Sequence, residues 1–204
     1  MSDTIHFSDH VTITRVQGAA LASFDTIVLT QSQMVFWKND DDQPHWPKFS
    51  TGKTPPVLAY QVGPNATSGS VQPALALPGY DGSTPLPQGQ ASQANYTCSL
   101  HPGEAGVINI YADFYSQASQ LPGASSGKKY SANLTIGGVP DFTFRVSNSS
   151  LPASLNVVIV NPLQGPALSG TPGPNDTGNF WFDLDCQDAA GNNVTQTFQV
   201  IVTP

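Results

Sequence analysis

Charged side chains are scarce in this 204-residue chain, where only 10% of the residues are Asp, Glu, Lys or Arg. An ordinary soluble domain has about 25%, so Ser, Thr, Asn, Gln and Gly must supply most of the polar surface. Seven basic against fourteen acidic residues give a net charge of -7. Binding of nucleic acid or of an anionic membrane surface needs clustered positive charge. The composition therefore argues against both kinds of partner.

Long apolar runs and catalytic signatures are also missing. No stretch approaches the roughly 20 apolar residues that a spanning helix needs, so we expect no transmembrane segment. The sequence has no nucleophile elbow, no phosphate-binding glycine loop and no paired carboxylates of the glycosidase kind. We therefore predict that the chain is not an enzyme.

Cysteine is limited to Cys98 and Cys186, which lie far apart and outside any Cys-x-x-Cys pattern. This spacing predicts neither a disulfide framework nor a structural zinc site, and each thiol needs its own explanation. Cys186 ends a strand-like segment, where we interpret it as a small buried apolar side chain.

Short alternating segments make up most of the chain, and no long amphipathic helix is indicated. Eighteen Gly and eighteen Pro residues separate these segments as turns. We predict an all-β protein with strands at residues 5–16, 26–30, 34–37, 57–62, 95–98, 107–111, 131–136, 142–146, 155–160, 179–185 and 195–202. The apolar alternation stops in the small, polar segment SQASQLPGASSGKK, which begins at Ser116. This break predicts a first domain at residues 1–117, a linker at 118–129 and a second domain at 130–204.

The second domain contains the phrase LSGTPGPNDTGNFWFDLDCQDAAGNNVTQTFQVIV, from Leu168 to Val202. It resembles an Ig-like repeat of bacterial surface and secreted proteins, and the resemblance covers most of residues 130–204. The resemblance implies an Ig-like β-sandwich that serves as a spacer or adhesive module. Alternation at period two predicts a set of inward-facing side chains: Phe180, Phe182, Leu184, Phe198, Val200 and Val202.

The first domain contains two phrases rich in possible metal ligands, VFWKNDDDQPHWPKF from Val35 and YTCSLHPGEAG from Tyr96. A histidine after one strand, followed later by Cys-x-x-His between two strands, resembles the cupredoxins, particularly plastocyanin and amicyanin. The resemblance covers roughly residues 3–115 and implies a Greek-key β-sandwich with one copper ion. It implies His45, Cys98 and His101 as equatorial ligands. A thiolate suits Cu(I) and imidazole suits either copper state.

Two further residues complete the implied site. Asn39 matches the family asparagine that ties the two ligand loops together by hydrogen bonds, a supporting role. The family usually has a methionine after the second loop histidine, but this chain has only Met1 and Met34, and Glu104 stands at that place. Glu104 is then either a hard, anionic axial ligand or a solvated carboxylate beside an axial position that is empty or filled by a backbone carbonyl.

The resemblance implies single-electron transfer through His101, flanked by an apolar docking patch of Pro44, Trp46, Pro47 and Pro102. Copper sequestration or delivery is an alternative function, for which Glu104 is a more natural donor than for fast electron exchange. A structural module of an envelope or surface protein is a second alternative, and an enzyme would require an open coordination position at the copper. We expect a periplasmic or extracellular protein whose signal peptide is absent from this sequence. The redox partner protein and the oligomeric state stay open.

Overall fold

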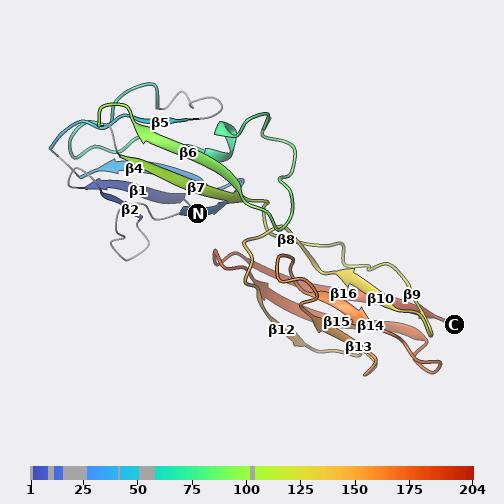
Figure 1. Ribbon diagram of the computed structural model, residues 1–204. Helices are drawn as coiled ribbons and strands as arrows, with labels where there is room; N and C mark the ends of the chain where they lie inside the picture. The colour runs from blue at the N-terminus through green and yellow to red at the C-terminus, as the bar shows by residue number, and fades with distance from the viewer. Residues whose placement is uncertain (1, 9–11, 16–26, 41, 51–57, 102–103) are drawn as a thin grey trace. The chain divides into compact units, whose positions relative to one another are not determined.

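The computed structural model describes residues 2–8, 12–15, 27–40, 42–50, 58–101 and 104–204. Within these residues the chain forms strands, loops and a short 3-10 helix, which confirms the all-β class (Figure 1). Two compact units are present. The first contains residues 1–86 and 91–111, and the second contains residues 87–90 and 112–204.

The first unit has two sheets. One has the order β2-β1-β4, in which β1 is antiparallel to β2 and parallel to β4. The other has the order β3-β7-β6-β5, with β3 parallel to β7 and antiparallel pairing elsewhere. Their bounds are β1 (Ser2–Ser8), β2 (Thr12–Arg15), β3 (Ile27–Thr30), β4 (Met34–Asn39), β5 (Pro47–Phe49), β6 (Ser92–Cys98) and β7 (Ala105–Tyr111).

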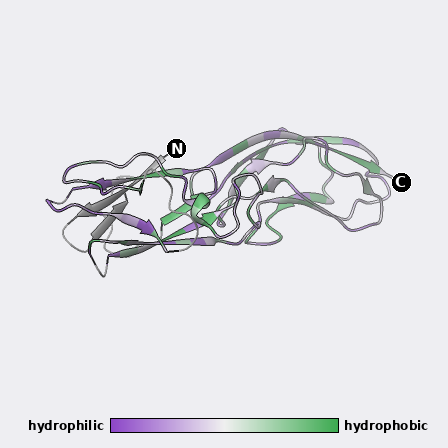
Figure 2. Cartoon of the chain, turned by 90° about the horizontal axis from the view of Figure 1, so that it is seen from above, coloured by the Kyte–Doolittle hydropathy of each residue, from purple (hydrophilic) through white to green (hydrophobic). Residues whose placement is uncertain are grey.

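The core of this unit lies between β4 and the strands of the second sheet. Alternate residues of β4, β6 and β7 are buried, as period two requires. Trp37 on β4 contacts Phe49 and Tyr96 edge-on, with ring centroids 5.9 and 5.6 Å apart. The helix η2 (Pro73–Ala76) is coloured as hydrophobic in Figure 2. Its residues Ala74 and Ala76 are buried in the same core.

Strand register brings the two ligand-bearing connections to one end of this unit. Pro47 at the start of β5 pairs with Cys98 at the end of β6, and Thr97 pairs with Ala105 at the start of β7. The connection that precedes β5 and the connection between β6 and β7 therefore meet at the same sheet end.

The strand predicted at residues 57–62 is wrong for its described part, residues 58–62. Only Val62 is extended there, and its N–H and C=O both bond to the backbone of His45, at 2.7 and 3.0 Å. Val62 therefore forms an isolated β-bridge with His45 instead of belonging to a strand, and this bridge holds His45 in place.

The second unit also has two larger sheets. Their orders are β12-β15-β16-β9 and β10-β14-β13, and a two-stranded sheet pairs β11 with β8. The bounds are β8 (Tyr115–Ser116), β9 (Ala124–Ser125), β10 (Tyr130–Asn133), β11 (Thr135–Ile136), β12 (Thr143–Ser147), β13 (Leu155–Val158), β14 (Ala167–Gly170), β15 (Gly178–Gln187) and β16 (Asn193–Thr203). Five of the six predicted inward side chains are fully buried, and Phe180 is half-buried. The rings of Phe182 and Phe198 stack with centroids 5.6 Å apart.

The segment predicted as a linker, residues 118–129, differs from that expectation. It contains β9, which runs parallel to β16, and Leu121 and Ala124 are buried in the core of the second unit. Leu121 N–H also donates to Gln199 O at 2.8 Å. Because the rest of the segment is small and polar, the sequence does not indicate that these two apolar residues are buried. Strand β9 of this segment lies at the edge of its sheet.

In the part of the chain that the structure describes, no helix has the length and hydropathy required to cross a lipid bilayer.

Candidate metal centre

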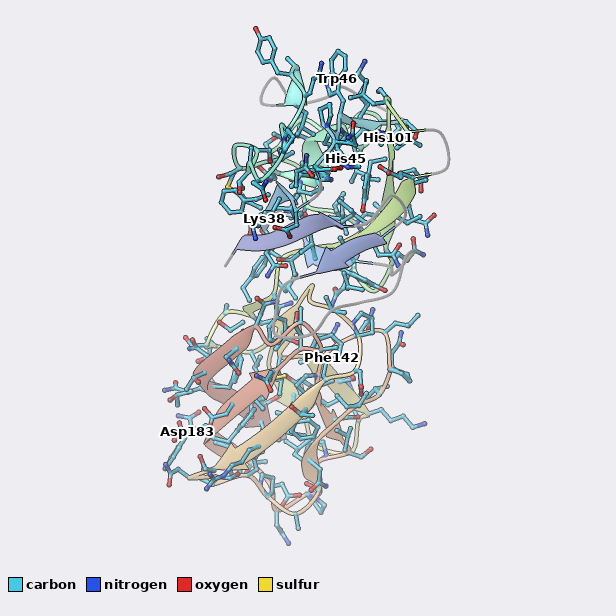
Figure 3. All side chains as sticks on the ribbon, turned by 90° about the vertical axis from the view of Figure 1, so that its left-hand side faces the viewer. Lys38, His45, Trp46, His101, Phe142 and Asp183 are labelled. Carbon is cyan, nitrogen blue, oxygen red and sulfur yellow. The ribbon has the colours of Figure 1, made fainter. Side chains whose placement is uncertain are left out.

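Four side chains of the first unit converge at the sheet end described above. His45 precedes β5, Cys98 ends β6, and His101 and Glu104 follow in the connection to β7. One donor atom from each of the four lies within 4.8 Å of the others. Figure 3 shows His45, His101 and Trp46 gathered at this end of the unit. The structure therefore brings together all four residues that the sequence singles out as metal ligands.

The donor atoms face one another at short distances. His45 Nδ1 and His101 Nδ1 lie 3.2 Å apart, and Cys98 Sγ lies 3.8 and 3.5 Å from these two atoms. Bonds of about 2.0–2.3 Å to one first-row metal ion place neighbouring donors about 3.3–3.8 Å apart at tetrahedral or trigonal angles. The spacing of the two nitrogens and the sulfur therefore fits a single metal ion.

Burial differs among the four residues. His45 is 1% exposed and Cys98 is 6% exposed, and the side chain of Glu104 is 5% exposed. His101 is the outermost, with 29% of its side chain exposed. Three donors are thus shielded from water, and one imidazole reaches the surface.

Glu104 is a buried carboxylate with two different oxygens. Its Oε2 lies 2.8 Å from His45 Nδ1, whereas its Oε1 is buried and has no hydrogen-bond partner among the described residues. Oε1 lies 3.6 Å from His101 Nδ1, inside the same donor cluster. The burial of Glu104 contradicts the alternative of a solvated carboxylate. A buried oxygen without a hydrogen-bond partner is unfavourable, and coordination of a metal ion would supply the missing partner.

Main-chain hydrogen bonds fix the connection that contains Glu104. Cys98 N–H donates to Glu104 O at 2.9 Å, and Glu104 N–H donates to His101 O at 3.2 Å. These bonds close the connection on itself, so that the carboxylate points back toward Cys98 and His45. No periodicity in the sequence signals this closure.

Asn39, at the end of β4, is fully buried. Its Nδ2 donates to Gln43 O at 2.7 Å and to Val62 O at 2.9 Å. Because Val62 bridges to His45, both bonds hold the His45 side of the centre. The backbone of Trp46 also links the two ligand-bearing connections.

Trp46 is the supporting residue that the sequence analysis missed in this role. Its backbone N–H donates to Cys98 Sγ at 3.3 Å, and its carbonyl accepts from Ser99 N–H at 2.9 Å. These bonds follow from the register that sets Pro47 opposite Cys98. Pairing of strands almost fifty residues apart cannot be derived from local pattern.

The expected docking patch is only partly present. Pro44 and Trp46 are half-buried, whereas Pro47 is buried as the first residue of β5, which corrects its assignment to the surface. Pro102 lies outside the described residues. Leu100, which the sequence analysis did not select, is 38% exposed beside His101 in the chain.

Cys186 belongs to β15 of the second unit. It is buried among apolar side chains, as predicted. Burial, with a smaller contribution from the negative charge of Asp188, raises the pKa of its thiol to about 12. The thiol is therefore neutral and inert at ordinary pH.

Known proteins offer only distant similarity. No protein-family model and no curated sequence matches the chain. Among solved structures it is similar to amicyanin from Paracoccus versutus, at 11% identity and a TM-score of 0.33 over 53% of this chain and 80% of that one. It is also similar to a multicopper oxidase from Campylobacter jejuni, at 9% identity and a TM-score of 0.33 over 100% of this chain and 58% of that one.

A third similarity is to an endo-fucoidan hydrolase, at 14% identity and a TM-score of 0.37 over 87% of this chain and 28% of that one. Similarities this low do not extend to function. What the chain can do follows from the chemistry of its own donor cluster.

Proposed function

We propose that the first unit binds one copper ion at His45, Cys98, His101 and Glu104 and transfers single electrons. The observation that carries this proposal is the convergence of two imidazole nitrogens, a sulfur and a carboxylate oxygen within 4.8 Å. Two histidines and a cysteine suit an ion that cycles between Cu(II) and Cu(I). When bound, copper supplies one-electron exchange.

The surrounding chain keeps the donors in place. Two backbone hydrogen bonds to Val62 hold His45 in place. In the connection that contains Glu104, Cys98 N–H donates to Glu104 O and Glu104 N–H donates to His101 O. Because these bonds hold the donors in place, the side chains have to move little when the charge of the site changes. This favours rapid electron transfer. The partly exposed His101 is the point at which electrons would enter and leave.

Glu104 would be the fourth donor. Its unpartnered Oε1 lies in the cluster, and its carboxylate is buried. A hard, anionic oxygen favours Cu(II) over Cu(I) and lowers the reduction potential relative to a thioether donor. We therefore expect a red or green site instead of a blue one.

Copper sequestration or delivery is the second candidate. It is favoured by the same buried carboxylate, which completes a set of four donors and strengthens the binding of Cu(II). Reversible reduction at a physiological potential discriminates the two, because an electron carrier must cycle and a storage site need not.

The second unit is proposed as an Ig-like spacer. Its two larger sheets share one apolar core, and inward side chains alternate along its long strands β15 and β16. Together the units suit a non-enzymatic protein of the periplasm or the cell exterior, where a redox partner protein would dock near His101.

The test is a titration of the apo protein with Cu(II), followed by visible absorption and electron paramagnetic resonance. The wild type should show an intense thiolate-to-copper band that saturates at one equivalent. Cys98→Ser should abolish this band, and Cys186→Ser, the matched control, should retain it. Glu104→Gln should shift the band and the hyperfine splitting. A wild type without the band would overturn the copper function and favour a structural pair of sandwiches.

A further inference from the structure

Trp46 is the residue whose main chain joins the two sides of the metal centre. It follows His45 directly, donates its N–H to Cys98 Sγ and accepts from Ser99 N–H. A small rotation of this one peptide would change the hydrogen bond to the sulfur. The orientation of the peptide is therefore important to any metal bound there.

The indole of Trp46 is held at two points. Its Nε1–H donates to Leu58 O at 2.8 Å, and Leu58 is itself buried in the core of the unit. The ammonium of Lys48 lies 3.8 Å from the centroid of the ring, within the range of a cation–π contact. One contact fixes the edge of the ring and the other its face.

The placement of these residues follows from the alternation of β5. Pro47 and Phe49 point inward and are buried, whereas Lys48 is half-buried on the outer face. Trp46, two residues before Lys48, falls on that same face. The cation–π contact between Lys48 and Trp46 is therefore a consequence of strand geometry. It involves the residue that directly follows His45.

We infer that Trp46 is a positioning residue, whose indole, held by Leu58 O and Lys48, fixes the N–H···Sγ hydrogen bond to Cys98. The inference rests on the proposed copper function. Hydrogen bonding around the cysteine sulfur tunes the potential of such sites. An N–H donor withdraws charge from the sulfur, favours the reduced ion and raises the energy of the charge-transfer transition.

Trp46→Phe tests this role, because it keeps an aromatic ring and loses the donor to Leu58 O. The copper-loaded variant should still bind one equivalent. Its thiolate-to-copper band should move to longer wavelength and its reduction potential should fall. Trp181→Phe, a substitution of the same kind on β15 of the second unit, should change neither quantity.

A second measurement uses the apo protein and needs no metal. Hydrogen exchange of the Trp46 backbone amide should be slow in the wild type and at least several-fold faster in Trp46→Phe. Lys48→Gln should also accelerate this exchange, because it removes the contact on the ring face. Loss of the Lys48 charge could also change the reduction potential of the copper directly, but the hydrogen-exchange rate of the Trp46 amide does not depend on that potential.

The outcomes separate the two proposals. A wild type with no thiolate-to-copper band overturns the copper function. A wild type with the band, together with an unchanged band and potential in Trp46→Phe, overturns the positioning role alone. If Trp46→Phe does not fold, Lys48→Gln decides, and unchanged exchange of the Trp46 amide in that variant overturns the role.

Discussion

His45 Nδ1 and Glu104 Oε2 lie 2.8 Å apart, and both side chains are almost completely buried. The other carboxylate oxygen of Glu104 has no hydrogen-bond partner among the described residues. A buried polar atom without a partner is unfavourable in the metal-free protein. A metal ion in the donor cluster would relieve this cost and link binding to stability.

Copper should therefore stabilise the first unit against unfolding. Free Cu(II) at 100 times its dissociation constant should add about 2.7 kcal/mol to the free energy of unfolding. Thermal unfolding of the apo and loaded forms measures the difference, and a chelator should reverse it. Cys98→Ser should show a much smaller rise. Equal stability of the two wild-type forms would favour a structural module in which metal is incidental.

Loss of the Asn39 side chain should damage the centre without touching a ligand. Asn39→Ala removes two hydrogen bonds, the one to Gln43 O and one of the two that Val62 O accepts. At about 0.5–1.5 kcal/mol for each bond, we expect the free energy of unfolding to fall by about 1–3 kcal/mol. Supporting residues of this kind also typically change metal affinity by about 10–100-fold. Urea unfolding and a copper competition assay measure the two effects.

Asn109→Ala is the matched control for Asn39. Its amide accepts a hydrogen bond from Gln93 at the surface of the same unit, so we expect a change in stability of only a few tenths of a kcal/mol. Similar losses in the two variants would contradict the role given to Asn39.

Gly106 should tolerate no side chain. A Cβ there would lie 2.8 Å from Tyr96 Cε1 and closer still to its hydroxyl, and Tyr96 is buried. We expect Gly106→Ala to lower the free energy of unfolding by about 1–3 kcal/mol through overpacking. Gly63→Ala, where a Cβ meets nothing within 4 Å, should be nearly neutral.

Tyr96→Phe supplies a further check on Gly106. Removing the hydroxyl should recover part of the loss in the double variant, because the hydroxyl is the atom nearest to the added Cβ. A double variant no more stable than Gly106→Ala would place the clash elsewhere.

The thiol of Cys186 should resist alkylation until the protein unfolds. Its pKa is raised from 9.0 to about 12, chiefly by burial, so at pH 8 its thiolate fraction is about a thousand times lower than that of an unfolded thiol. In Cys98→Ser, where Cys186 is the only thiol, iodoacetamide should label the native protein far more slowly than the denatured one. Rapid labelling of the native form would contradict its burial.

The same raised pKa gives a pH dependence of stability with a defined sign. The neutral thiol is favoured in the folded state, so its contribution is complete below pH 9.0 and decreases as the pH rises toward 12. Between about pH 9 and 10.5 the free energy of unfolding should fall more steeply in Cys98→Ser than in the double variant that also has Cys186→Ala. If the free energy of unfolding depends on pH in the same way in both variants, Cys186 does not cause this pH dependence.

Azide should not bind to the copper-loaded protein. Four donor atoms lie within 4.8 Å of one another and three of the four residues are buried, so we expect the four donors to exclude an added ligand. Visible spectra with and without excess azide should coincide. A new azide-to-copper band would reveal an open position and favour an enzymatic function.

The sequence predicted the all-β class and the alternation of β15 and β16 because these depend on local periodicity. It also selected the four residues of the donor cluster, because two short phrases contain all of them. The burial of Pro47 and the bond from Trp46 to Cys98 could not be predicted, since both depend on the register between β5 and β6. The burial of Glu104 likewise depends on the backbone closure between Cys98 and Glu104.

That closure makes the backbone of the connection independent of the side chains it presents. The bonds that join Cys98, His101 and Glu104 use only N–H and C=O groups, so the side chain at position 104 can change while the frame persists. Glu104→Met would then exchange a hard donor for a soft one at a fixed place. Selection could adjust the affinity and potential of this centre through one codon, without redesigning the sandwich that carries it.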